Sequence, residues 1–164
     1  NLLYEWEIRK WQKHLEEAWK HIGKTNLLVD RFKSALFEIK KYPETKKDIK
    51  SVFGVMAEKI FGIVNSSCVM FRVMEIKKLK TLSEYFQVRE AKDAKNIKIG
   101  NRELIYGKSD DFTIIASQAE NIKIRTFCVF PKVELNKEQK IFINKIVDDF
   151  TMLYVIFGFY ALQK

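Results

Sequence analysis

Few residues in this chain are suited to catalysis, and their spacing argues against a catalytic site. The two histidines, His14 and His21, lie seven residues apart. In a helix this spacing separates them by about 10 Å, which is too far for a shared metal ion without further ligands. The rest of the chain has no histidine, which excludes Ser-His-Asp and Cys-His nucleophilic arrangements and the usual zinc sites there.

The two cysteines, Cys68 and Cys128, both lie in apolar, strand-like runs and do not form a CxxC pair. A disulfide and two free thiols are the alternatives. We expect buried free thiols in a reducing compartment, because buried cysteines commonly serve as small apolar residues. No signal peptide is visible, so the predicted location is the cytoplasm. Because the sequence begins with Asn1 rather than Met, we expect a fragment of a longer protein.

Two carboxylate pairs are the remaining candidates for acid-base chemistry. Asp110-Asp111 precedes an expected strand, which suits a loop or ligand position, and Asp148-Asp149 is expected on the polar, solvated side of the last helix. Adjacent carboxylates seldom converge on one reacting atom. Neither a GxxxxGK[ST] loop nor a GxGxxG motif is present. We therefore predict a non-enzyme with no catalytic residue, no cofactor and no metal site.

Charge is unevenly distributed along the 164 residues, which carry a formal net charge of +9. The segment 72–108 alone has ten basic and five acidic side chains. One interpretation is a basic binding module for nucleic acid or an acidic protein partner. The other is a lysine-rich set of solvated surfaces, because no dense Arg/Lys run with interleaved aromatic residues occurs.

The first forty residues carry apolar side chains at alternating spacings of four and three. A repeat of 3.5 residues keeps one apolar seam facing a partner helix. A helix over residues 2–41 would be about 60 Å long at ~1.5 Å per residue, and Pro43 disfavours its continuation. We expect residues 1–42 to form a helical or coiled-coil arm and residues 43–164 to form a separate α/β domain.

Within this domain the apolar patterns predict helices and strands in a definite order. A helix is expected at 45–64, a strand at 68–76 in the centre of a sheet, a second strand at 82–90, a hairpin of strands at 112–117 and 122–130, and a helix at 136–162. Residues 91–109 are ambiguous, with a helical turn at 91–95 and either a strand or a short helix at 103–106. The order predicts an α+β fold with a central antiparallel sheet flanked by helices.

The last expected helix starts with Asn136 and Gln139, a capping-box pattern. From Met152 to Leu162 it is apolar all round, which is shorter than the roughly 20 residues that span a bilayer. We therefore expect no membrane span, one face of this helix on the sheet and the other against the long N-terminal helix. The predicted dimer-interface residues are Ile8, Trp11, Leu15, Ile22, Phe150, Tyr154 and Phe157.

The runs CVMFRVMEI and FTIIAS…IKIRTFCVF, followed by a polar link into NKEQKIFINKIVDDF, resemble a GAF domain over about residues 44–164. The resemblance implies a sensory domain of a bacterial signalling protein, with flanking helices that pair in a homodimer. It places a small-molecule pocket beneath about Leu79–Asp111. The candidate ligand-binding residues there are Arg72, Phe86, Arg89, Tyr106, Asp111 and Ser117.

The chain also departs from the GAF family. The signature of cyclic-nucleotide GAF domains is absent, no cysteine lies in a loop suited to chromophore attachment, and the domain has no histidine for haem. The expected function is a non-catalytic sensory or regulatory domain that binds an unidentified small molecule or partner. It would relay that binding through its terminal helices to an adjoining effector domain. A purely structural assembly module is a further alternative.

Overall fold

The computed structural model describes residues 9, 46–89, 95–118 and 123–163, with side chains described to Ile156. The predicted arm at 1–42 therefore lies outside the described residues, together with His14, His21 and the interface residues Ile8, Trp11, Leu15 and Ile22. The helical turn predicted at 91–95 also lies outside the described residues, apart from Lys95, and so does the side chain of Phe157.

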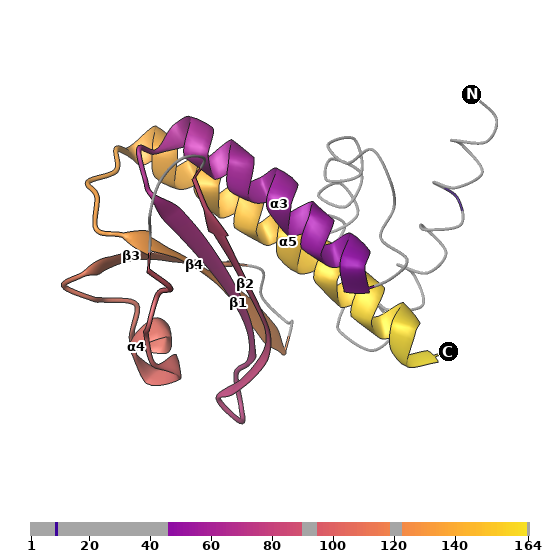
Figure 1. The fold of residues 1–164 in the computed structure, drawn as a ribbon. Coiled ribbons are helices and arrows are strands. Elements are labelled where there is room, and N and C mark those ends of the chain that lie inside the picture. Colours follow the sequence, from indigo (N-terminus) through magenta and orange to yellow (C-terminus); the bar gives the residue numbers. More distant parts are fainter. Residues whose placement is uncertain (1–8, 10–45, 90–94, 119–122, 164) are drawn as a thin grey trace.

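A four-stranded antiparallel sheet forms the centre of the domain (Figure 1). Its strands are β1 (Cys68–Glu75), β2 (Lys80–Val88), β3 (Phe112–Ala116) and β4 (Ile124–Pro131), in the spatial order β2-β1-β4-β3. The predicted α+β fold and the central position of the first strand are confirmed. The predicted hairpin is confirmed as the antiparallel pair β3 and β4.

Helices α3 (Lys46–Ile63) and α5 (Lys137–Gln163) lie side by side on one face of this sheet (Figure 1). The capping box at the start of α5 is confirmed, because the Asn136 amide donates to Gln139 Oε1 at 2.9 Å and the Gln139 amide donates to Asn136 Oδ1 at 2.8 Å. Gln139 Nε2 also donates to the carbonyl oxygen of Ile63 at 3.0 Å. This contact fixes the start of α5 against the end of α3.

The main apolar core lies between the two helices and the sheet. Phe71 of β1 is at its centre, with its ring 5.1 Å from that of Phe53 on α3 and 5.0 Å from that of Phe150 on α5. Strand alternation sends Val69, Phe71 and Val73 to this face, since successive side chains point to opposite faces. The helix residues that the 3.6-residue period predicts to face the sheet are buried here.

A smaller cover lies on the opposite face of the sheet. It consists of residues 95–107, here called the covering segment, which contain the short helix α4 (Asn101–Tyr106) (Figure 1). Ile97, Ile99 and Leu104 from this segment pack on Met70 and other side chains of that face. The ambiguity at 103–106 is thus resolved as a helix, which ends at Gly107 in the left-handed conformation that favours glycine, with φ 78°.

No helix in the described part of the chain is long and apolar enough to cross a membrane.

Candidate functional site

Among the described residues, Arg72 is the only Lys or Arg side chain that is buried, with 8% of its surface exposed. It lies in the middle of β1, where alternation directs it away from the helices and toward the covering segment. Burying a charge is costly unless it is paired and hydrogen-bonded. The contacts of its guanidinium therefore decide what this face of the sheet can do.

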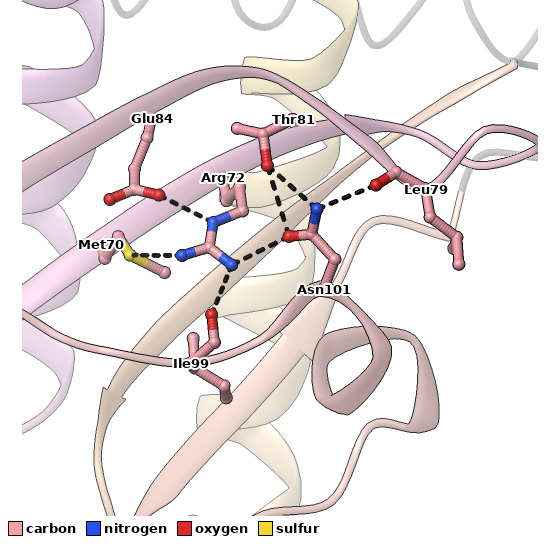
Figure 2. A network of polar contacts seen from close by, with 7 residues as sticks. All are labelled: Met70, Arg72, Leu79, Thr81, Glu84, Ile99 and Asn101. Carbon is pink, nitrogen blue, oxygen red and sulfur yellow. Dashed lines mark hydrogen bonds and ion pairs between the residues drawn. The ribbon is translucent and has the colours of Figure 1, made fainter.

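The guanidinium joins three parts of the chain (Figure 2). Nε donates to Oε2 of Glu84 on β2 at 2.7 Å, and Nη1 donates to the carbonyl oxygen of Ile99 at 2.7 Å and to Oδ1 of Asn101 at 3.0 Å. Antiparallel pairing sets Arg72 directly opposite Glu84, so this ion pair follows from the strand register. The contacts to Ile99 and Asn101 tether the covering segment to the sheet.

Asn101 extends this network to the turn between β1 and β2. Its Nδ2 donates to the carbonyl oxygen of Leu79 at 2.9 Å and to Oγ1 of Thr81 at 3.2 Å. One carboxamide thus accepts from the Arg72 guanidinium and donates to the turn (Figure 2). The Arg72 network, defined as Arg72, Glu84, Ile99, Asn101, Leu79 and Thr81, fixes the covering segment and the turn in one arrangement.

The opposite face of the sheet has polar contacts to α5. The hydroxyl oxygens of Thr126 on β4 and Thr151 on α5 lie 2.7 Å apart, and Thr151 Oγ1 is 2.8 Å from the carbonyl oxygen of Val147. Both threonines are fully buried. Thr151 Oγ1 donates toward both Thr126 Oγ1 and the Val147 carbonyl oxygen, and because a hydroxyl has a single proton, the two acceptors share it. Nearer the end of α5, the hydroxyls of Ser83 and Tyr154 lie 2.8 Å apart.

Two of the predicted ligand-binding residues share the face that the covering segment occupies. Phe86 pairs with Met70 across β2 and β1 and is partly buried against the same apolar cluster as Leu104. Arg72 and Phe86 are therefore both beneath the cover. Apolar side chains of the chain itself fill the space that the GAF resemblance assigns to a ligand.

The structure does not bring the other four predicted residues to this place. Tyr106 at the end of α4 is 78% exposed, and Asp111 is exposed at the start of β3. Arg89 Nη1 donates to Oδ1 of Asn65 at 3.1 Å, beyond the far end of β2. Ser117 is buried at the end of β3, where its Oγ accepts from the Thr126 amide at 3.0 Å.

Two predicted interface residues of α5 contact the sheet of their own chain. The Phe150 ring is fully buried and packs on Phe71 and Tyr85, at centroid distances of 5.0 and 5.7 Å. Tyr154 is partly buried beside it. These contacts account for both side chains within one copy of the domain.

The expectation that Asp148 and Asp149 are solvated is wrong. They are only 3% and 1% exposed, and Asp148 Oδ1 accepts a hydrogen bond from the Gln118 amide at 2.7 Å. Both side chains make contacts. Asp148 lies beside the end of β3, so it caps a main-chain amide there instead of facing water. The helical period alone could not indicate this tertiary contact.

Both cysteines are free and buried, as predicted. Strand alternation places Cys68 on the face of the covering segment and Cys128 on the face of the helices, so the sheet separates the two sulfur atoms. Burial raises the pKa of both thiols above the ordinary value of 9.0. A neutral buried thiol is a poor nucleophile and metal ligand.

An open groove of about 1060 Å³ follows the outer edge of β3. Its walls come from residues 107–110, from residues 132–135 and from Lys140 and Asn144 of α5. Basic and acidic side chains both line it, and none of the six predicted ligand-binding residues does. The described residues contain no cluster of three or more His, Cys, Asp or Glu side chains that could hold a metal ion.

Arg72 is the one residue of the Arg72 network that the sequence identified as part of a site, and Glu84 and Asn101 are the side-chain partners that it missed. A charged residue in the otherwise apolar run of β1 was the available signal, because it requires a partner. The hairpin register would then have indicated Glu84. Nothing in the local sequence indicated Asn101, which lies 29 residues beyond Arg72.

Comparisons with known proteins give no relative from which a role could be taken. No family model, no curated protein and no solved structure matches the chain.

Proposed function

We propose that this chain contains a non-catalytic regulatory domain. In this proposal a ligand or partner binds at the covering segment, and the sheet transmits the change to α5. The Arg72 network is the observation that carries the proposal. Arg72 is a buried cation. Its contacts to the covering segment are hydrogen bonds to one main-chain carbonyl oxygen, that of Ile99, and to one carboxamide, that of Asn101.

Those two neutral acceptors are weaker partners for a guanidinium than an anion would be. Carboxylate and phosphate groups form charge-assisted, often bidentate contacts with arginine. An anionic group that reached Arg72 would compete with the Ile99 carbonyl and the Asn101 side chain. Release of these contacts would free the covering segment, which is the kind of two-state element that regulation requires.

The route from Arg72 to α5 passes through neighbouring strands. Arg72 pairs with Phe127 on β4. The residue before Phe127, Thr126, contacts Thr151 of α5. Phe71, which precedes Arg72, packs on Phe150 of the same helix. A shift of β1 would therefore reach α5 through one buried hydroxyl pair and one aromatic pair.

The output in this proposal is a change in the terminal helices. The arm predicted at residues 1–42 and the end of α5 would pair with those of a second copy and pass the change to an adjoining effector domain. The heptad spacing of the first forty residues supports the pairing. Sedimentation of the chain with and without residues 1–40 tests it, and monomers in both cases at high concentration would exclude it.

The relay itself is tested by thermodynamic coupling between Arg72 and Thr151. We expect Arg72→Met and Thr151→Val to be non-additive in the free energy of unfolding, by about 0.5 kcal/mol or more, although the two side chains lie on opposite faces of the sheet. The control pair is Arg72→Met with Val52→Ala, a buried substitution on α3, which should be additive. Denaturant titration of the single and double variants measures both cycles.

Additivity of Arg72→Met and Thr151→Val, within about 0.3 kcal/mol, would contradict the relay. Equal non-additivity of Arg72→Met and Val52→Ala would also contradict the relay, because the coupling would then reflect a general loss of packing and not a specific route to Thr151. A second test is native mass spectrometry of the purified chain. A copurifying small anion that Arg72→Met releases would support binding at this position.

A further inference from the structure

Exposed cations gather at the end of the sheet that carries the turn between β1 and β2. They come from three segments that contact one another, since Asn101 Nδ2 donates to the Leu79 carbonyl oxygen at 2.9 Å and the Ile76 amide donates to the Lys123 carbonyl oxygen at 3.2 Å. We call this set the basic tip. Its six cations, all exposed, are Lys77, Lys78, Lys80, Lys98, Arg102 and Lys123.

Few acidic side chains offset this charge. Within residues 75–80, 98–103 and 123–124 the only acidic residues are Glu75 and Glu103, so two carboxylates accompany the six cations. The turn between β1 and β2 projects from the sheet at this end, near α4 (Figure 1). Three of the six cations, Lys77, Lys78 and Lys80, lie in or directly beside this projecting turn.

Leu79 lies at the point of this turn, among three of the lysines. It has φ 52° and is the only residue other than glycine with a positive φ among the described residues. Side chains with a Cβ atom adopt this left-handed conformation at a cost, and glycine or asparagine usually occupies such a position. Here a leucine does, and its apolar side chain is 37% exposed.

The rest of the domain holds Leu79 in this conformation. The Leu79 amide donates to the Ile76 carbonyl oxygen at 3.3 Å, and its own carbonyl oxygen accepts from Asn101. Arg72 in turn fixes Asn101 (Figure 2). A strained leucine that the Arg72 network holds in place, with lysines on both sides, is an arrangement that a solvated turn does not require.

We propose that the basic tip docks on a membrane surface that contains anionic lipids, with Leu79 entering the headgroup region. Cations attract anionic headgroups, and an apolar side chain among them adds contact with the acyl boundary. Single-stranded nucleic acid is bound by several aromatic side chains that stack on successive bases among the cations. Residues 75–80, 98–103 and 123–124 contain no aromatic residue, and the one exposed aromatic residue on α4 is Tyr106, one turn after Arg102. The inference is independent of the proposed regulatory role.

Vesicle co-sedimentation of the full chain tests this inference. We expect binding to vesicles of phosphatidylcholine with phosphatidylserine, weakening as salt rises, and little binding to phosphatidylcholine alone. Lys77→Glu/Lys78→Glu/Lys80→Glu should reduce the affinity at least about tenfold. The matched control is Lys132→Glu/Lys137→Glu/Lys140→Glu, which makes the same charge change on exposed lysines away from the tip and should reduce it much less.

Leu79→Gly separates a membrane surface from other polyanions. Glycine suits the positive φ of this position, so the variant should fold, and circular dichroism checks that it does. It keeps every cation and removes only the apolar side chain, so vesicle binding should weaken about three- to tenfold. Binding of a single-stranded RNA oligonucleotide, measured in parallel, should not respond to this change.

Three results would overturn the inference. One is no binding to phosphatidylserine vesicles at low salt, and another is an equal loss in the matched lysine control. The third is vesicle binding that Leu79→Gly leaves unchanged while the oligonucleotide binds as tightly as the vesicles. That last result would assign the basic tip to nucleic acid.

Discussion

The two faces of the central sheet are covered in different ways. On one face, α3 and α5 bury a continuous apolar cluster around Phe71. On the other, a six-residue helix and an extended stretch cover a smaller cluster, and Arg72 tethers them. Apolar burial by long helices is spread over many side chains, whereas the cover depends on a few polar contacts. Regions with few apolar contacts open more readily, so the covering segment is where a ligand or partner could act.

The largest expected effect is on the helix-covered face. Phe150→Ala should lower the free energy of unfolding by about 3–5 kcal/mol, because it removes a fully buried ring and leaves a cavity. Phe142→Ala on the same helix is the control, since that side chain is 58% exposed and its loss should cost within about 0.5 kcal/mol. Denaturant titration measures both. Similar costs for the two variants would contradict the position of the core.

A smaller effect is expected from Arg72→Met, about 1–3 kcal/mol. The change leaves the Ile99 carbonyl without its guanidinium donor. Glu84 is a third exposed and can be solvated when its partner is lost, which limits the cost. Arg72→Lys should recover only part of the loss, since an ammonium group lacks the planar fork of donors. Full recovery by lysine would show that charge alone, and not the network geometry, tethers the covering segment.

A third prediction concerns the buried hydroxyl pair between the sheet and α5. Thr151→Val should cost about 1 kcal/mol, because the Thr126 hydroxyl loses its donor while it stays buried. Thr126→Val/Thr151→Val removes both partners and should cost less than the sum of the single changes. Thermal unfolding of the three variants measures this. Simple additivity would contradict a hydrogen bond between the two hydroxyls.

The smallest effect is a pH dependence from the buried thiols. Because burial raises the pKa of Cys68 and Cys128, the folded state keeps protons that the unfolded state loses above about pH 9. Their contribution to stability is therefore complete below that pH and decreases as the pH rises above it. Both thiols should resist a thiol-specific reagent at pH 8 until denaturant is added. Rapid labelling of the native protein would contradict their burial.

The difference between the two faces of the sheet also explains which helices and strands could be predicted from the sequence. The helices and strands of the helix-covered face follow from apolar periodicity, because each long element there repeats one pattern against one surface. The covering segment has no such repeat. Its helix is one and a half turns long with a single fully buried residue, Leu104, and its position depends on contacts from Arg72 to residues 27 and 29 positions away.

The candidate site was predictable only in part for the same reason. Arg72 and Phe86 were also selected by their place along the chain, and antiparallel pairing and strand alternation place them on one face of the sheet. Tyr106, Asp111, Arg89 and Ser117 were selected by their place along the chain, and the fold separates them because a loop's path is set by tertiary contacts. The burial of Asp148 also depends on such a contact, with the main chain at Gln118.

Native-state hydrogen exchange of the unmodified chain tests most directly whether the two covers are energetically distinct. The amides to follow are those of Leu104 and Gly107, which are bonded within α4, and those of Phe71 in β1 and Phe150 in α5. We expect the α4 amides to exchange through an opening with a lower free energy and a weaker denaturant dependence than the amides of Phe71 and Phe150. Equal opening free energies for all four amides would mean that the sheet and both covers unfold as one unit, and would contradict the account.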